Sequence, residues 1–271
     1  MMESVQLTNP ETDNFLEKLR QIDLTLLIPA YNEKDAIKVV LDQYCRYISD
    51  FDLPWKIIVS VDGSDGTSNV VENFSRLYPF VSQNKNGARA GKGAAIKRGL
   101  NLIDTEYTFL MDADDSVRMS DCLNALMNLN GEDAVLLSRY GGYQNKIPIR
   151  RLVPSRGFNV LVRSSLGINT RDTQTGYKIV KTELLREGFK RIAVTNTFFD
   201  VALLYYLKKR KASVSEIDVE YEHREESKFN ILGEIIGQGI SLLAFRIWHS
   251  RLQRLIPEGF VGIYFRLFKW V

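Results

Sequence analysis

The sequence predicts an α/β fold: a doubly wound, mostly parallel sheet with helices on both faces. Strand-length runs rich in Val, Ile and Leu alternate along the chain with segments whose apolar residues recur at helical spacing. The runs are apolar almost without interruption, as in parallel strands that are buried on both faces. Polar motifs follow three of these runs, and the ligands of such sheets bind at the carboxyl ends of the strands.

The elements follow one another as one doubly wound unit over residues 1–140, beginning after a polar N-terminal arm (residues 1–21). The predicted strands cover residues 24–30, 55–62, 107–112 and 133–139. The predicted helices cover residues 35–48, 67–77, 92–103 and 119–129.

The composition is that of an ordinary globular protein. Its 36 basic and 33 acidic residues leave a net charge of +3, which is too small to indicate a nucleic-acid partner. Cys45 and Cys122 fall within helical patterns, which favours reduced thiols in a cytosolic setting. The N-terminus lacks the order of a signal peptide and no run reaches about 18 apolar residues, so we expect no membrane-spanning segment.

The C-terminal segment, residues 231–271, is amphipathic, aromatic and basic. On a predicted helix over residues 231–255, one stripe contains Ile236, Ile240, Leu243 and Ile247. From residue 246 onward, five basic residues stand against one acid. This pattern is typical of a helix that lies on a membrane surface or binds a partner. The alternative is a helix that packs its aromatic side chains on the domain.

Three aspartates end the third predicted strand, in the stretch YTFLMDADDSV (107–117). Clustered carboxylates repel one another and are costly to dehydrate, so stability does not explain them. Asp112 and Asp114 lie two residues apart, which points their side chains the same way on a strand, while Asp115 points elsewhere. Carboxylate oxygens suit Mg²⁺ or Mn²⁺ shared with a substrate diphosphate. A solvated turn is the alternative.

Three other motifs are excluded by their spacing. In GARAGKG (87–93), three residues separate Gly87 from Gly91, where a phosphate loop of the Walker type needs four. Gly93 follows the lysine, where that loop needs Ser or Thr. DADDSV lacks the glycine and the closing glutamate of a calcium loop. No G-x-G-x-x-G follows the first strand, which excludes a dinucleotide-binding turn.

Motifs that follow one another in a fixed order carry a resemblance to a known family. IPAYNE, VSVDGSDGTSNVV, NKNGARAGKGAAIKRGL and LMDADD resemble the nucleotide-sugar half of glycosyltransferase family 2, which implies a GT-A fold. LSRY, PSRGFNVLVR, RDTQTGYKIV, FFDVALLYYL and EESKFN are similar to the second half of dolichyl-phosphate glucosyl- and mannosyltransferases. The resemblance covers residues 22–232. It implies a GT-A domain over residues 22–230, with a nucleotide-sugar half (22–138) and an acceptor half (139–230).

The resemblance implies a donor site at these motifs. The residues that would contact the nucleotide sugar are Pro29, Ala30, Tyr31, Glu33, Asp62, Lys92, Asp112, Ala113, Asp114 and Gln174. Asp172 would be a further polar contact in a strand and turn over residues 171–178. Lys92 opens a helix, where backbone N–H groups and one cation can meet a phosphate; a surface lysine is the alternative. Asp62 also lies in a turn in which Thr67 could cap the next helix.

The resemblance implies an acceptor-phosphate site of basic and hydroxyl side chains. The implied residues are Arg139, Arg156, Arg224, Ser227 and Lys228. Arginine suits this role because its planar fork binds phosphate oxygens bidentately. For Arg139 and Arg156 the alternative is pairing with surface acids. Glu225 stands where the family often has glycine, which departs from the pattern beside Arg224.

Asp200 stands where related transferases place a catalytic carboxylate. Thr197 and Asp200 also have the spacing of a helix-capping box, with Asp in place of Glu. A lipid phosphate is already an anion at neutral pH, so the reaction hardly needs a general base. We therefore expect Asp200 to orient other groups or set their charge.

Together these features predict a metal-dependent, inverting hexosyltransferase with UDP-glucose as the first choice of donor and dolichyl or polyprenyl phosphate as acceptor. We expect it at the cytoplasmic face of a membrane, as a peripheral protein. The alternatives are a family 2 enzyme with a protein or soluble glycan acceptor, and a non-catalytic nucleotide-sugar-binding scaffold. The sequence leaves the oligomeric state open.

Overall fold

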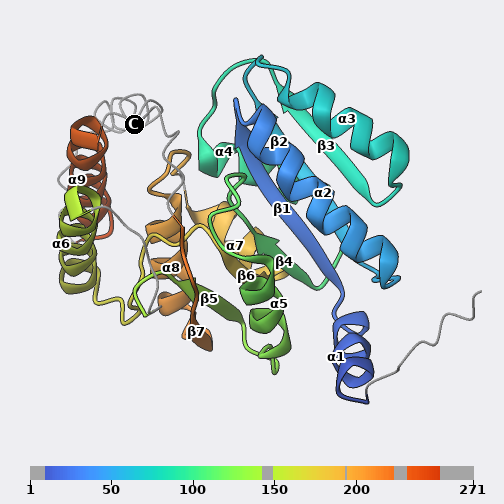
Figure 1. Cartoon of the computed structure of the whole chain (residues 1–271). Coiled ribbons are helices and arrows are strands. Elements are labelled where there is room, and N and C mark those ends of the chain that lie inside the picture. Colours follow the sequence, from blue (N-terminus) through green and yellow to red (C-terminus); the bar gives the residue numbers. More distant parts are fainter. Residues whose placement is uncertain (1–9, 142–148, 193, 223–230, 251–271) are drawn as a thin grey trace, which may run out of the picture.

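The computed structural model of the protein describes residues 10–141, 149–192, 194–222 and 231–250 (Figure 1). Its strands are β1 (Leu24–Tyr31), β2 (Lys56–Asp62), β3 (Val81–Asn86), β4 (Tyr107–Leu110), β5 (Ala134–Ser138), β6 (Lys178–Lys181) and β7 (Val214–Asp218). Its helices are α1 (Pro10–Arg20), α2 (Lys34–Asp50), α3 (Thr67–Leu77), α4 (Lys92–Leu100), α5 (Met119–Met127), α6 (Ile149–Leu166), α7 (Thr182–Arg191), α8 (Phe199–Lys209) and α9 (Ile231–Trp248).

The seven strands form one mixed sheet in the order β3-β2-β1-β4-β6-β5-β7. Neighbours β3, β2, β1 and β4 are parallel, and β5 is parallel to β7. Only β6 runs the other way, antiparallel to β4 and β5 on its two sides. The first residue of β6, Lys178, therefore pairs with Leu110, the last residue of β4. This reversal brings the start of β6 to the carboxyl ends of the parallel strands.

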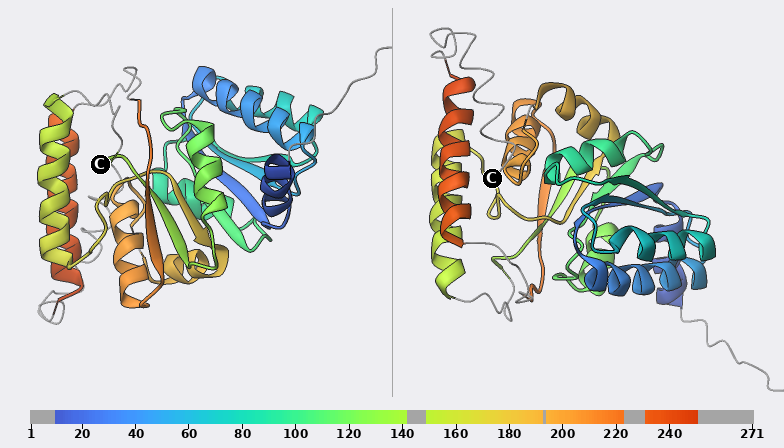
Figure 2. Two further views of the ribbon diagram at one scale, coloured as in Figure 1. Left: turned by 60° about the horizontal axis from the view of Figure 1, so that its bottom comes forward. Right: turned by 90° about the horizontal axis from the view of Figure 1, so that it is seen from above.

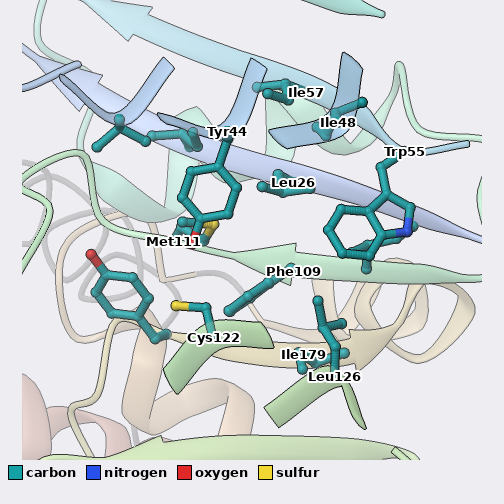
Figure 3. Packing of buried hydrophobic residues seen from close by; sticks show 14 of the residues in the cluster. Leu26, Tyr44, Ile48, Trp55, Ile57, Phe109, Met111, Cys122, Leu126 and Ile179 are labelled. Atoms are coloured by element: carbon teal, nitrogen blue, oxygen red, sulfur yellow. The ribbon is translucent and has the colours of Figure 1, made fainter. Parts of the chain in front are cut away.

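Two cores lie on the two faces of the sheet. One contains α1, α2, α3 and α5, and Figure 3 shows its centre, where Tyr44 of α2 and Cys122 of α5 belong to the same cluster as Leu26 of β1 and Phe109 of β4. The other contains residues of α4, α6, α7, α8 and α9. Along β1, Leu26 and Ile28 belong to the first core and Leu27 to the second, as the two-residue period of a strand requires. The doubly wound α/β architecture predicted from the sequence is confirmed.

Two strands, β3 and β6, differ from the sequence-based prediction, because β3 is polar and β6 is short. The strand β3 reads VSQNKN and lies at the edge of the sheet, where it lacks the apolar run of a buried strand. The predicted strand within residues 171–178 is wrong, because β6 begins only at Lys178. The third strand also ends earlier than predicted, at Leu110.

An outer layer is formed by α6 and α9, which lie side by side at one edge of the molecule (Figure 2). The inward face of α9 packs Leu242 and Phe245 into the second core. Exposed large apolar side chains on the two helices are Val153, Val160, Leu161, Ile236, Ile240 and Leu243. In the described part of the chain, no helix is long and apolar enough to cross a membrane.

Trp55 ties the N-terminal helix to the sheet and generates a stability prediction. Its side chain is buried, and its indole N–H donates to the carbonyls of Leu19 (3.2 Å) and Ile22 (3.1 Å) at the end of α1. We expect Trp55→Ala to lower the free energy of unfolding by about 3–5 kcal/mol, because it leaves a cavity and removes the indole donor from both carbonyls. Urea denaturation measures this. Leu77→Ala, at an exposed position of α3, is the control and should change stability little.

Candidate active site

The loops that follow β1 and β2 are tied together by hydrogen bonds. The backbone N–H of Ser64 donates to Oδ1 of Asn32 (3.2 Å), and that of Lys34 donates to Oδ2 of Asp65 (3.2 Å). Thr67 Oγ1 accepts the N–H of Glu33 at 3.0 Å. The helix α3 begins at Thr67, and Gly66 occupies the N-cap position. The interpretation of Thr67 as an N-cap is therefore wrong. These bonds fix the PAYNE and DGSDGT loops as one surface.

Tyr31 ends β1 at this surface and is 40% exposed. The guanidinium carbon of Arg89 lies 4.8 Å from the centre of its ring. Pro29 and Ala30 precede it within the strand, where Ala30 is buried. Among these three predicted nucleotide contacts, Tyr31 is thus the most exposed.

Asp62 ends β2 in the register position opposite Tyr31. Its carboxylate is buried and forms an ion pair with Arg98 of α4. Its other oxygen accepts the backbone N–H of Ala90 at 2.7 Å. Asp62 therefore holds the GARAGKG loop against the sheet edge, and its predicted contact with the nucleotide stays a prediction.

The acidic turn begins two residues after β4 ends. Because Asp112–Asp115 are not part of a strand, strand alternation does not place their side chains. The Oδ1 atom of Asp114 accepts the N–H of Ser116 at 3.1 Å. Burial and the nearby charge of Asp112 raise the pKa of Asp114 above its usual value. Asp115 has φ +52° and turns toward Gln43, whose Nε2 lies 3.5 Å from its Oδ2.

The absence of a side chain at Gly176 leaves room for the Asp112 carboxylate. A Cβ atom at Gly176 would lie 1.7 Å from Oδ2 of Asp112, so only glycine leaves room for that oxygen. The hydroxyl of the next residue, Tyr177, donates to the Asp112 carbonyl at 3.4 Å. The segment that enters β6 thus packs directly on the acidic turn.

A chain of four charged side chains runs from the acidic turn into the core. Lys92 Nζ lies 2.8 Å from Oδ1 of Asp112 and 3.0 Å from Oδ2 of Asp200. The other oxygen of Asp200 lies 2.6 Å from Nζ of Lys178, which is fully buried. The helix α8 begins at Phe199 and Asp200 is bound by lysines, so the capping-box interpretation of Thr197 and Asp200 is wrong.

The charges of this chain stabilise one another. Burial would raise the pKa of Asp200, but Lys178 and Lys92 outweigh it and hold that pKa below the usual value. Burial would lower the pKa of Lys92, but Asp112 and Asp200 raise it above the ordinary range. For Lys178 burial dominates, and its pKa is lowered despite Asp200. An ionised Asp200 with two ammonium partners is a poor proton acceptor at neutral pH.

Arg139 and Arg156 meet at one aromatic ring. Arg139 follows β5 and pairs with the buried Asp172 through Nε (2.7 Å) and Nη2 (2.9 Å). The guanidinium carbons of Arg139 and Arg156 lie 5.8 Å and 5.5 Å from the ring centre of Tyr140. Asp172 also accepts the N–H of Gln174 at 3.1 Å. The structure therefore brings together two predicted acceptor-site arginines and shows that the Asp172 carboxylate is bound by Arg139.

Asp112 and Asp114 have the donor chemistry of a shared metal site. The Asp112 side chain is 36% exposed, so a ligand can reach it. Among the residues that the structure describes, no group of three or more His, Cys, Asp or Glu side chains is arranged to hold a metal ion. Two carboxylates without a third protein ligand fit Mg²⁺ or Mn²⁺ whose coordination is completed by water and a substrate diphosphate.

Three of the predicted acceptor residues, Arg224, Ser227 and Lys228, fall outside the residues that the structure describes.

Two residues of the candidate site were not predicted from the sequence. Lys178 and Arg98 were not singled out, although both bind predicted site aspartates. A lysine at the start of the apolar run KIVK is unusual because a buried lysine needs a partner, and that is the signal that could have revealed Lys178.

The mixed sheet, with two tied loops and an acidic turn at the carboxyl ends of its parallel strands, has a GT-A-like fold. Residues 25–189 match the family described as Glycosyl transferase family 2. The chain belongs to this family and is a glycosyltransferase.

Curated relatives and solved structures agree with this assignment. The dolichyl-phosphate beta-glucosyltransferase ALG5A of Trichomonas vaginalis is 29% identical over 239 residues, which are 83% of this chain and 73% of that protein. The human dolichyl-phosphate beta-glucosyltransferase is 29% identical over 83% of this chain and 75% of its own. A Mycobacterium tuberculosis glucosyl-3-phosphoglycerate synthase structure with Mn²⁺, uridine diphosphate and glucosyl-3-phosphoglycerate has a TM-score of 0.63 at 17% identity, covering 86% of this chain and 83% of that one.

The Arg139–Asp172 pair generates a prediction of pH-dependent stability. Burial would raise the pKa of Asp172, but Arg139 outweighs it and holds that pKa below its usual value. The stabilisation is therefore complete above the unfolded-state pKa of about 4 and is lost as the pH falls through the lower folded-state pKa. We expect Asp172→Asn to cost about 3–5 kcal/mol at pH 7, because it removes the buried, doubly hydrogen-bonded carboxylate from the partly buried Arg139.

Urea denaturation between pH 7 and pH 3 measures both effects. The loss at pH 7 should shrink as the pH falls through the folded-state pKa of Asp172. The matched control is Asp104→Asn, which breaks the exposed Lys56–Asp104 pair and should leave stability nearly unchanged. A constant difference between Asp172→Asn and the unmodified protein at every pH would contradict the linkage.

Proposed function

We propose that the protein is a metal-dependent, inverting glycosyltransferase that moves a hexose from a nucleotide diphosphate sugar to dolichyl or polyprenyl phosphate. The observation that carries this proposal is the acidic turn of Asp112 and Asp114 at the end of β4, beside the ammonium group of Lys92. The acceptor is inferred from relatives that are named dolichyl-phosphate beta-glucosyltransferases. UDP-glucose is the first choice of donor, because these relatives are named glucosyltransferases and the glucosyl-3-phosphoglycerate synthase structure holds uridine diphosphate.

The donor would lie across the ends of β1, β2 and β4. Tyr31 and Glu33 would border the base and ribose, with Pro29, Ala30 and Asp62 shaping that surface. Asp112 and Asp114, with Ala113 between them, would hold Mg²⁺ or Mn²⁺, which neutralises diphosphate charge and so stabilises the leaving group. Lys92 would add a cation at the N-terminus of α4, where backbone N–H groups also favour phosphate.

The acceptor phosphate would enter beside Arg139 and Arg156. Its oxygen forms the new bond to the anomeric carbon as the bond from that carbon to the nucleoside diphosphate breaks, which inverts the configuration. The nucleophile is already ionised at neutral pH, so no proton has to be removed. Asp200 would therefore act through the lysines that it binds, and Gln174 would contact the sugar. Arg224, Ser227 and Lys228 complete the proposed acceptor set.

A lipid acceptor requires contact with a membrane, and the α6–α9 layer would provide it. Its outer side carries the exposed apolar residues named above together with exposed Arg156, Arg163 and Arg246. The helix α6 contains no Asp or Glu. Apolar side chains flanked by arginines suit the headgroup region of a bilayer with anionic lipids. We place the protein peripherally at a cytoplasmic membrane face, with residues 22–230 as catalytic domain and residues 231–271 as the membrane-associated segment.

The catalytic proposal predicts that Asp114→Asn lowers the transfer rate roughly 100-fold or more, because one of two metal-binding carboxylates is lost. The assay supplies UDP-glucose, Mn²⁺ and a short polyprenyl phosphate, and mass spectrometry identifies the product. Asp115→Asn is the matched control in the same turn and should keep most activity. Full activity of Asp114→Asn would remove the metal role from this carboxylate.

The acceptor is tested in the same assay. Donor consumption should require the polyprenyl phosphate and should persist with no added protein or soluble glycan. GDP-mannose replaces UDP-glucose in a parallel reaction to test the donor. Transfer to a soluble glycan in the absence of lipid phosphate would contradict the proposed acceptor while leaving the family 2 activity intact.

The membrane proposal predicts that an outer-layer variant binds vesicles less well. We expect Ile240→Ser/Leu243→Ser to lower binding to vesicles of anionic phospholipid at least fivefold. Each of these exposed apolar side chains would contribute up to about 1.5–3 kcal/mol if the bilayer buried it fully. Flotation through a density gradient measures the bound fraction. Leu77→Ser removes an exposed apolar side chain on α3 and should bind as the unmodified protein does. Equal flotation of both variants would contradict the proposed surface.

A further inference from the structure

The chain Asp112–Lys92–Asp200–Lys178 contains two different kinds of ion pair. At its inner end, Lys178 has no exposed surface and Asp200 is buried. Lys178 also donates to the Thr175 carbonyl, so its ammonium group is held from two sides. At the outer end, Asp112 is 36% exposed and borders the donor surface. The inner pair is thus fixed within the core, and the outer pair is accessible.

Topology explains why the inner pair lies beside the acidic turn. Lys178 starts the reversed strand β6 and pairs with Leu110 of β4 on one side and Leu136 of β5 on the other. Asp200 comes from the first turn of α8, in the second core. Both are therefore held by regular structure. Lys92, at the first position of α4, is partly buried and reaches both carboxylates, so it can remain bound to one and leave the other.

Lys92 and a divalent cation would compete for the same carboxylate. The Lys92 ammonium lies 2.8 Å from Oδ1 of Asp112, one of the oxygens that the proposed metal would use. A divalent cation at that oxygen repels an ammonium group at this distance. Asp200, whose own anionic charge is secured by Lys178, offers Lys92 a second anion within 3.0 Å. Lys92 can therefore give up Asp112 without becoming an unpaired charge.

We propose that Lys92 is an exchangeable counter-ion of Asp112 and that the Asp200–Lys178 pair is the anchor that lets it exchange. Without donor, Lys92 neutralises Asp112. In the donor complex, Asp112 takes the cation in place of Lys92, and the ammonium group, still bound to Asp200, turns to the donor phosphate. Lys178 is thus a positioning residue that acts through Asp200. The inference rests on the proposed donor and metal site. It goes beyond that site by assigning a positioning role to Lys178 and by stating that Asp112 binds Lys92 first and the cation afterwards.

Binding of Mn²⁺ alone tests the competition without any turnover. In the absence of nucleotide, we expect Lys92→Met to bind Mn²⁺ about tenfold more tightly than the unmodified protein, as measured by electron paramagnetic resonance of free Mn²⁺. With Mn²⁺ present, the same variant should bind uridine diphosphate more weakly, because the phosphate loses a cation. Lys97→Met is the matched control, since it removes an exposed lysine of the same helix and should change neither affinity.

The anchor is tested by Lys178→Met/Asp200→Asn. This double variant removes both charges of the inner pair and leaves no unpaired ion in the core, and a circular dichroism melt confirms its fold. Lys92 then has only Asp112 as partner, so we expect Mn²⁺ alone to bind threefold to tenfold more weakly. A merely structural pair would leave this affinity unchanged. The two variants thus shift Mn²⁺ affinity in opposite directions.

The outcomes separate this inference from the proposed function. If Lys92→Met does not bind Mn²⁺ more tightly than Lys97→Met, or if the folded double variant binds Mn²⁺ as the unmodified protein does, the inference is overturned. If the unmodified protein binds no uridine or guanosine diphosphate with Mn²⁺ present, the proposed function fails instead, while the Mn²⁺-only comparison still decides the exchange.

Discussion

The carboxylates at the end of β4 set the main constraint on this structure. Asp112 and Asp114 lie close enough that the charge of one raises the pKa of the other, at a place where burial also disfavours ionisation. Such a turn needs positive charge nearby. Lys92 supplies it, and Lys92 is in turn shared with Asp200. Charged side chains from α4, β6, α8 and the turn after β4 therefore form one connected group of ion pairs.

The reversed strand β6 makes that convergence possible. If β6 ran parallel to β4, its first residue would lie at the amino ends of the parallel strands, away from the acidic turn at their carboxyl ends. Because it is antiparallel, Lys178 and the preceding Gly176 reach the carboxyl ends of the parallel strands, where Gly176 contacts Asp112. The same edge receives Arg139 from the end of β5. The residues that we propose for the donor and those that we propose for the acceptor thus lie at the same ends of the strands of one sheet.

Local sequence predicted the elements whose signals are local. The apolar runs of β1, β2 and β5 and the periodic α2 and α5 were located to within a few residues, and Lys92 was placed correctly at the start of a helix. Polar β3 was missed because strand pairing at the sheet edge, rather than its own composition, makes it a strand. The partners of Asp62 and Asp200 lie 36, 108 and 22 residues away in sequence, so ion pairing required the tertiary structure.

The outer helices and the proposed donor surface are joined through one segment, Thr195 to Thr197. Gln238 of α9 donates to the hydroxyl of Thr197 at 2.7 Å, which joins the outer layer to the residues before α8. Two residues earlier, the carbonyl of Thr195 accepts the N–H of Ala94 at 3.1 Å and lies where a Cβ atom of Gly91 would clash. The position of α9 therefore helps to fix both the start of α4, with Lys92, and the start of α8, with Asp200. A layer suited to a lipid surface and an electrostatic site suited to a nucleotide sugar are in this way held by the same few residues.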